Sequence, residues 1–269
     1  MNLIDKRPNR TVVVSRIAIC AALYAVTIGI TAAIPTPFSI GQFRPGVVIP
    51  ALFSIIFGTL VGAVGAALGS FIGDIIFLTP LGRTDPFLAL VAGVPGNLVG
   101  FLIFGVIINR YRSWSWFMID SLVALFIGNF IAGAGVVLTV FQIRGTPLPF
   151  GAALGATLGF AFWWLFTMLP FMLLVLPLIL RVFLRYPTGR VWMGGFLTWK
   201  KESIRHIAVI SVLVSLPLFL VFVLSYTSYL SGAFIALGSI ADLIRYLILG
   251  SAIVLLFTPF APKIAGVEP

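Results

Sequence analysis

Charged residues, cysteine and histidine are scarce in this chain of 269 residues. Only 9% of the residues are charged, and Cys20 and His206 are each the only residue of their type. A single cysteine excludes an intrachain disulfide and a cysteine-rich metal site, and a single histidine argues against a histidine-based zinc site or catalytic triad. The sequence also lacks the Gly-x-x-x-x-Gly-Lys-Ser/Thr loop that binds nucleotide phosphates, so another subunit would have to supply any ATPase activity.

Apolar residues make up 61% of the chain, whereas soluble domains contain roughly 45–50%. So much apolar surface cannot be buried within one chain, which makes the lipid bilayer the expected solvent and helices the expected spanning elements. The sequence therefore predicts an all-α fold, a polytopic membrane helical bundle. The net charge of +10 does not indicate a nucleic-acid partner, because the basic residues are dispersed between apolar runs.

Eight apolar runs predict eight helices, since a spanning helix needs about 20 apolar residues. The stretch 46–78 is too long for one helix and short for two, and we divide it at Gly58-Thr59. The first run is too long for a signal-peptide core, so we expect it to remain as the first spanning helix. The sixth is longer than one crossing, which predicts tilt or a kink at Pro170 and Pro177. The predicted helices are 12–34, 47–57, 60–77, 87–108, 116–141, 150–183, 207–230 and 240–260.

The basic residues are distributed unevenly among the loops, which predicts the orientation of the chain. With a cytoplasmic N-terminus and an even number of helices, 13 of the 17 basic residues fall on the cytoplasmic side, as the positive-inside rule requires. Only Arg44, Arg83, Arg144 and Arg245 fall outside or near the outer end. We therefore expect a multi-pass protein of the cell membrane with both termini in the cytoplasm. Residues counted inside are Lys6, Arg7, Arg10, Arg16, Arg110, Arg112, Arg181, Arg185, Arg190, Lys200, Lys201, Arg205 and Lys263.

Small residues recur at helical spacing in two of the predicted helices. Helix 60–77 carries Gly62, Ala66, Gly69 and Gly73, and helix 12–34 carries several alanines. Such faces let two helix backbones approach closely in lipid. They indicate internal packing, or docking to another membrane subunit in the case of the first helix.

Several polar residues fall at membrane depth, where charge is costly. Asn97 and Asn129 are central in their helices and serve either interhelical hydrogen bonds or ligand contact. Asp120 lies one turn into helix 116–141, where interfacial water or a basic loop can hold it. Asp242 and Arg245 are three residues apart and are predicted to pair on one helical face.

Polar loop residues are expected to cluster above the bundle on its outer face. Arg44, Arg83 and Arg144 lie in three loops that this topology places on the same side, and Trp163 and Trp164 lie below them in helix 150–183. Polar groups over an aromatic-lined cavity are typical of a small-molecule site. Interfacial anchoring of the aromatic residues is the alternative.

Four segments of the first half carry a resemblance to a known family. They are residues 16–25 (RIAICAALYA), 37–45 (PFSIGQFRP), 49–58 (IPALFSIIFG) and 62–74 (GAVGAALGSFIGD). These segments resemble the substrate-binding S component of energy-coupling-factor (ECF) vitamin transporters, and the likeness extends roughly from Arg16 to Leu184.

The resemblance implies a six-helix unit that works with a transmembrane T component and two ATPase subunits. It also implies that an Ala-x-x-x-Ala motif, here Ala18 and Ala22, faces the T component. In that family the substrate binds near the outer face, under the loop between the first two helices, and the whole unit topples in the membrane. We accordingly expect a six-helix domain at 1–186, a basic cytoplasmic linker at 187–206 and two additional helices at 207–269, which depart from the family pattern and put the usual mode of docking in doubt.

The leading hypothesis is a binding subunit that captures a vitamin or related micronutrient for ATP-driven uptake. Arg44, Arg83 and Arg144 would guide or close over the ligand, and Asn97, Asn129 and Trp163 would contact it. Three outer cations hint at an anionic or acceptor-rich substrate. We expect no cofactor, no metal and no catalysis.

Two other functions stay open at this point. A membrane enzyme or assembly factor acting on lipid would need a catalytic constellation, and Asp74 and Asp85 are the only acids placed near the outer face, without a histidine beside them. A secondary transporter that works alone is disfavoured because no inverted repeat is visible.

Overall fold

The computed structural model describes residues 9–192, 199–228 and 241–266. These residues form helices and their connections, with one isolated antiparallel bridge between Pro35 and Gln42. Seven of the described helical segments are long and apolar enough to cross a membrane, and an eighth, Pro45–Phe57, is shorter. The predicted all-α polytopic bundle is confirmed.

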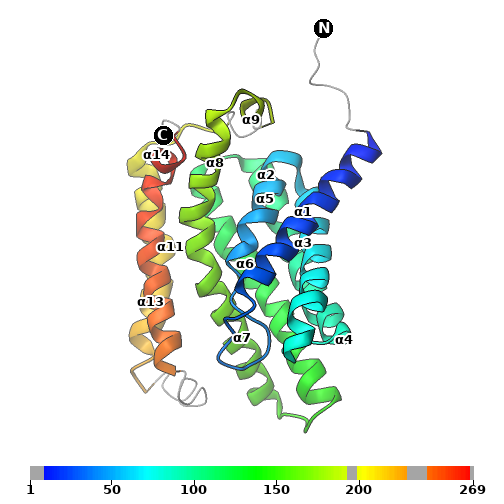
Figure 1. Cartoon of the computed structure of the whole chain (residues 1–269). Coiled ribbons are helices and arrows are strands. Elements are labelled where there is room, and N and C mark those ends of the chain that lie inside the picture. Colours follow the sequence, from blue (N-terminus) through cyan, green and yellow to red (C-terminus); the bar gives the residue numbers. More distant parts are fainter. Residues whose placement is uncertain (1–8, 193–198, 229–240, 267–269) are drawn as a thin grey trace.

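Six helical segments form the bundle up to Arg185 (Figure 1). Five of them include π-helical or 3-10 turns, so a single segment carries more than one label. In chain order they are α1 (Arg10–Thr31); η1 (Pro45–Val47) and α2 (Val48–Phe57); α3 (Thr59–Gly73), η2 (Asp74–Leu78) and η3 (Thr79–Leu81); α4 (Pro86–Leu88), η4 (Ala89–Gly93) and α5 (Val94–Tyr111); α6 (Trp114–Val137) and η5 (Leu138–Ile143); α7 (Phe150–Pro170), η6 (Phe171–Val175) and α8 (Leu176–Arg185).

The rest of the described chain forms a short helix and a helical pair. α9 (Pro187–Trp192) lies inside the predicted linker, and α11 (Ile204–Leu224) begins before the linker was expected to end. α13 (Ala241–Phe257), η8 (Thr258–Phe260) and α14 (Ala261–Ala265) complete the chain. The seventh helix ends at Leu224 and is followed by turns at 225–228, earlier than the predicted end at residue 230. The predicted start of the eighth helix, residue 240, lies outside the described residues.

The predicted division at Gly58-Thr59 is confirmed. Gly58 separates α2 from α3 with a φ of 99°, a conformation that glycine adopts without the strain of a Cβ atom. Asn109 of α5 braces this turn by donating from Nδ2 to the Ser54 carbonyl over 3.1 Å. A short α2 therefore reverses directly into α3 inside the bundle.

Four of the spans contain a π-helical turn, namely η2, η4, η5 and η6. The last of these follows Pro170 directly, so the helix widens at the first of the two prolines where a kink was expected. A π turn holds one extra residue within a helix and occurs frequently at functional sites.

α1 packs along α3 through the small residues of α3. A Cβ added to Gly69 would lie 2.7 Å from the Ala21 carbonyl oxygen, and one on Gly73 would lie 2.9 Å from the Ile28 side chain. The small-residue face of α3 therefore serves internal packing. Ala18 and Ala22 are exposed on α1, away from this contact.

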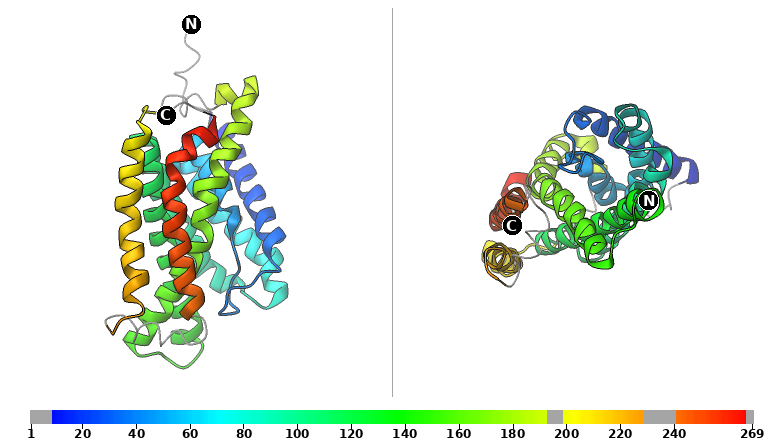
Figure 2. Two further views of the ribbon diagram at one scale, coloured as in Figure 1. Left: turned by 90° about the vertical axis from the view of Figure 1, so that its left-hand side faces the viewer. Right: turned by 90° about the horizontal axis from the view of Figure 1, so that it is seen from below.

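The pair α11 and α13 packs against α6 and α7, and α14 packs against α8. Figures 1 and 2 place this pair on the far side of the bundle from α1. Arg245 pairs with Asp242 at 2.7 Å, as predicted, and also donates to the Ser225 carbonyl at the end of α11 over 3.0 Å. The added helices thus leave the exposed face of α1 uncovered.

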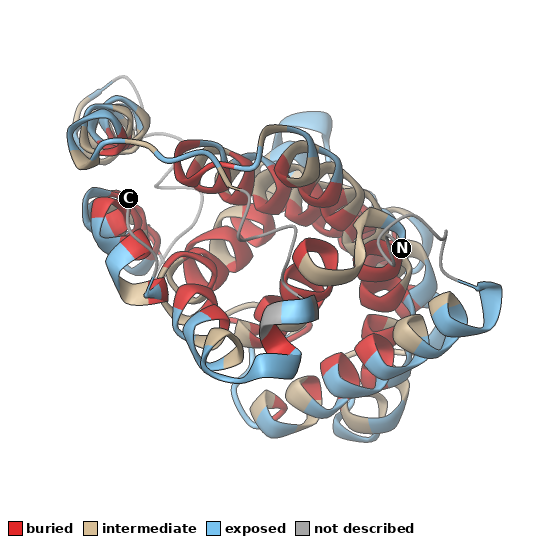
Figure 3. Ribbon diagram, turned by 90° about the horizontal axis from the view of Figure 1, so that it is seen from above, coloured by how far each residue is buried: buried red, intermediate tan, exposed pale blue. Residues whose placement is uncertain are grey.

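The two ends of the bundle differ in charge. The loops 32–44, 82–85 and 144–149 lie at one end, the bottom of Figure 1, which we call the loop end. α1 begins at the opposite end, where α9 and α14 also lie, and we call this the basic end (Figure 1). Figure 3 looks onto it and shows buried residues facing the interior of the bundle. Its exposed basic residues include Arg110, Arg112, Arg181, Arg185, Lys200, Lys201, Arg205 and Lys263.

Candidate functional site

A cavity lies within the six-segment bundle, in the half nearer the loop end. It extends from Ile40, Gly41 and Thr84 in the loops to Phe104 and Ala124 in the depth of the bundle. Small-molecule sites are concave and mostly apolar with a few polar groups, and the lining of this cavity has that character.

Glycine and alanine residues of η4, α5 and α6 form much of the cavity lining. Their small side chains also let α5 and α6 touch, since a Cβ on Gly96 would lie 2.7 Å from the Gly128 carbonyl oxygen. The result is a lining with few protruding side chains on this side of the cavity. Its members are Ala89, Ala92, Gly93, Gly96, Gly100, Ala124, Gly128 and Ala132.

Larger side chains complete the lining from α7 and η6. Trp164, Met168 and Met172 recur four residues apart, and Phe160, one turn before them, stacks on Trp164 with ring centroids 5.5 Å apart. The Trp164 indole N–H donates to the Gln42 carbonyl over 3.0 Å. Trp164 therefore lines the cavity and also holds the loop above it.

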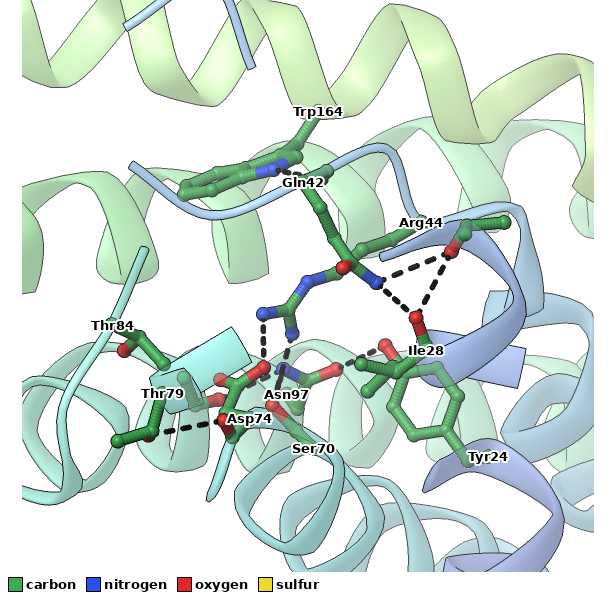
Figure 4. Close-up of polar contacts among 12 residues, drawn as sticks. Tyr24, Ile28, Gln42, Arg44, Ser70, Asp74, Thr79, Thr84, Asn97 and Trp164 are labelled. Atoms are coloured by element: carbon green, nitrogen blue, oxygen red, sulfur yellow. Dashed lines mark hydrogen bonds and ion pairs between the residues drawn. The ribbon is translucent and has the colours of Figure 1, made fainter. Parts of the chain in front are cut away.

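A buried polar network crosses the cavity lining (Figure 4). Arg44 donates from Nη2 to Asp74 Oδ1 over 2.6 Å and from Nη1 to Ser70 Oγ over 3.1 Å. Asn97 donates from Nδ2 to the same Ser70 oxygen over 3.1 Å, and its carbonyl oxygen accepts from the Tyr24 hydroxyl over 3.1 Å. The network joins α1, the first loop, α3, η2 and α5 in one chain of contacts.

The loop 32–44 is fastened at several points. Gln42 donates to the Ile28 carbonyl over 2.7 Å, and Arg83 donates from Nη1 to the Ala32 carbonyl. The Gly41 N–H donates to the Arg83 carbonyl over 3.1 Å. These bonds attach the loop to the end of α1 and to the second loop, over the cavity.

Arg144 and Asp85 form a separate ion pair at the loop end. Their side chains are 2.5 Å apart at the closest atoms and are 45% and 35% exposed. The hydrogen bond from Arg144 lowers the pKa of the Asp85 carboxyl below its ordinary value. The same carboxylate accepts from the N–H groups of Phe87 and Leu88 and so caps α4.

The predicted site residues divide into two groups. Arg44, Arg83, Asn97 and Asn129 line the cavity, whereas Arg144 and Trp163 do not. Arg144 lies at the surface with Asp85, and the indole nitrogen of Trp163 is buried without a hydrogen-bond partner in the described structure. Trp164, one residue further along α7, takes the cavity position instead.

The two asparagines have different hydrogen-bonding capacity left for a ligand. Both Asn97 groups are used, by Tyr24, Ser70 and the Gly93 carbonyl. The side chain of Asn129 makes a single hydrogen bond among the described residues, a weak one from Nδ2 to the Met168 sulfur over 3.5 Å. Asn97 therefore serves the interhelical network, and Asn129 keeps donor and acceptor capacity facing the cavity.

The structure separates the two acids that a catalytic dyad would need. Asp74 is buried and paired with Arg44, and Asp85 is paired with Arg144 at the surface. Within the described residues no group of histidine, cysteine and acidic side chains could hold a metal ion. Asp120, expected near interfacial water or a basic loop, is instead fully buried, and its carboxylate oxygens have no hydrogen-bond partner in the described part of the chain.

These features define a class of protein: a multi-pass membrane protein with a largely apolar cavity toward one end of a six-segment helical bundle. The sequence profile of the family described as ECF-type riboflavin transporter, S component, matches residues 9–150. The chain belongs to this family of S components, which are substrate-binding subunits of transporters and not enzymes. No curated protein and no solved structure matches the chain.

Proposed function

We propose that this chain binds riboflavin or a closely related flavin from outside the cell, as the S component of an ECF importer. The observation that carries the proposal is the cavity. It combines a lining of glycine and alanine with Trp164 and two methionines, and so suits a flat, largely apolar ring system. The family described for riboflavin supports the same ligand.

We propose that Asn129 hydrogen-bonds to the polar edge of the flavin ring. The pyrimidine edge of a flavin presents a carbonyl next to an N–H. A carboxamide can accept from that N–H and donate to that carbonyl at the same time. Arg83, the other cavity-lining cation besides Arg44, would close the loop end over the ligand.

The orientation and partners follow from surfaces away from the cavity. We propose that the basic end faces the cytoplasm, because its exposed cations obey the positive-inside rule. The exposed Ala18 and Ala22 of α1 would dock the T component, whose two ATPase subunits supply the energy. The pair α11 and α13 lies on the far side of the bundle and leaves this face free.

The test is a titration of purified protein with riboflavin, followed through the fluorescence of the flavin. We expect binding that quenches the fluorescence, and an Asn129→Ala variant that binds about 10-fold or more weakly, because a buried hydrogen bond is lost. A second experiment tests the docking face: Ala22→Trp should abolish co-purification with the T component. Val209→Trp, on the exposed face of α11, is the matched control and should not. Absence of riboflavin binding by the unaltered protein would refute the proposed ligand.

A further inference from the structure

Each charged residue that lines the cavity makes a polar contact within the protein. Three charged residues line it, namely Arg44, Asp74 and Arg83. Arg44 is paired with Asp74 at 2.6 Å, and Arg83 donates to the Ala32 carbonyl. The third predicted cation, Arg144, lies outside the cavity and is paired with Asp85.

The pair between Arg44 and Asp74 is shielded from solvent. The side chains of Arg44 and Asp74 are 9% and 3% exposed. Arg44 also uses Nη1 on Ser70, and its Nε is buried without an acceptor among the described residues. The guanidinium keeps an unused Nε donor, but the carboxylate of opposite sign beside it offsets its charge toward a second anion.

The expected effect on an anionic ligand is unfavourable. A phosphate monoester carries about −1.5 to −2 charges at pH 7. Bringing it into a dry cavity requires a cation to pair with it, and a carboxylate nearby repels it. Discrimination of this kind works through repulsion of the wrong ligand as much as through attraction of the right one.

We propose that Asp74 is a specificity-determining residue that neutralises Arg44 and reserves the cavity for an uncharged vitamin, to the exclusion of its phosphate ester. This inference rests on the proposed function for the position of the ligand. It reverses the hint from the sequence that three outer cations favour an anionic substrate, because Arg44 and Arg144 are paired with carboxylates and Arg83 donates to the Ala32 carbonyl.

The experiment compares riboflavin with riboflavin 5′-phosphate in titrations of the purified full chain. We expect the unaltered protein to prefer riboflavin by roughly 100-fold. Asp74→Asn frees the Arg44 charge and should reduce this preference at least about tenfold. Asp74→Glu keeps the charge and should keep the preference. The double variant Arg44→Gln with Asp74→Asn is neutral again and should restore most of it.

Two results would overturn the inference while leaving the proposed function intact. One is comparable binding of both flavins by the unaltered protein. The other is an unchanged preference in Asp74→Asn while that variant still binds riboflavin. The measurement on the unaltered protein needs no variant, so it remains decisive if Asp74→Asn does not fold.

A different result would separate the two proposals. If neither flavin binds, the proposed ligand is wrong, and the same comparison moves to pyridoxine with pyridoxine 5′-phosphate and to pantetheine with its phosphate, by thermal shift. Stabilisation by an uncharged member alone supports the role of Asp74. Stabilisation by a phosphorylated member, or by none of the compounds, refutes it.

Discussion

Trp163 and Trp164 form a matched pair, because they are adjacent in one helix and only Trp164 lines the cavity. Trp164→Phe removes the hydrogen bond from the indole to the Gln42 carbonyl, worth about 0.5–1.5 kcal/mol. It also reduces an aromatic surface that stacks on Phe160 and faces the ligand, worth about 0.5–1.5 kcal/mol more. Together these losses correspond to a dissociation constant raised roughly 5- to 150-fold.

Trp163→Phe should leave ligand affinity within about twofold of the unaltered protein. The Trp163 indole N–H is buried without a hydrogen-bond partner in the described structure, so its removal leaves no acceptor unsatisfied. The assay is the quenching of riboflavin fluorescence, measured for both variants alongside their thermal unfolding. Equal loss of affinity in the two variants, with equal unfolding temperatures, would refute the assignment of the cavity to the Trp164 side of α7.

Three further changes test the polar groups. Asp120→Val replaces a fully buried carboxyl group, whose oxygens have no hydrogen-bond partner among the described residues, by an apolar side chain of similar size, and should stabilise the protein by about 1–3 kcal/mol in thermal unfolding; a lower unfolding temperature would contradict this. The hydrogen bond from Arg144 lowers the pKa of Asp85 from its ordinary value of 3.8. The ionised carboxylate therefore stabilises the loop end above pH 3.8, and this stabilisation is lost as the pH falls through the lowered pKa. Protection from hydrogen exchange at 144–149, corrected for the intrinsic exchange rate at each pH, should therefore fall below about pH 4, and Asp85→Asn should abolish that change; a protection that stays constant with pH would count against the pair. Tyr24→Phe removes the hydrogen bond from the hydroxyl to Asn97 and should lower the free energy of unfolding by about 1 kcal/mol. Tyr226, which follows α11, is exposed, so Tyr226→Phe is the control and should leave the stability unchanged.

Much of the fold could be predicted because membrane helices are marked by composition alone. Apolar length located each span that the structure describes. Gly58 marked the reversal between α2 and α3, since a helix rarely continues through a glycine at positive φ. The pairing of Asp242 with Arg245 was also predictable, because it depends only on helical spacing.

The candidate site was less accessible to sequence reasoning, because its contacts join distant segments. Nothing in the spacing of Arg44 and Asp74 indicates that they pair, since the contact depends on how the first loop folds over η2. The choice between Trp163 and Trp164 depends on a rotation of about 100° around the helix axis. The recurrence of large side chains at 160, 164, 168 and 172 contained that information, but it becomes meaningful only once the cavity is known.

The π-helical turns contribute to the cavity from three different spans. Asp74 lies in η2, Ala92 in η4 and Met172 in η6. Each turn accommodates one surplus residue while the helix on either side keeps its regular course. Loss or gain of a single amino acid at such a turn would rotate one wall of the cavity and leave the rest of the span in register. In related proteins that carry different cargo, we therefore expect one-residue gaps within the membrane spans themselves, in addition to variation in the surface loops.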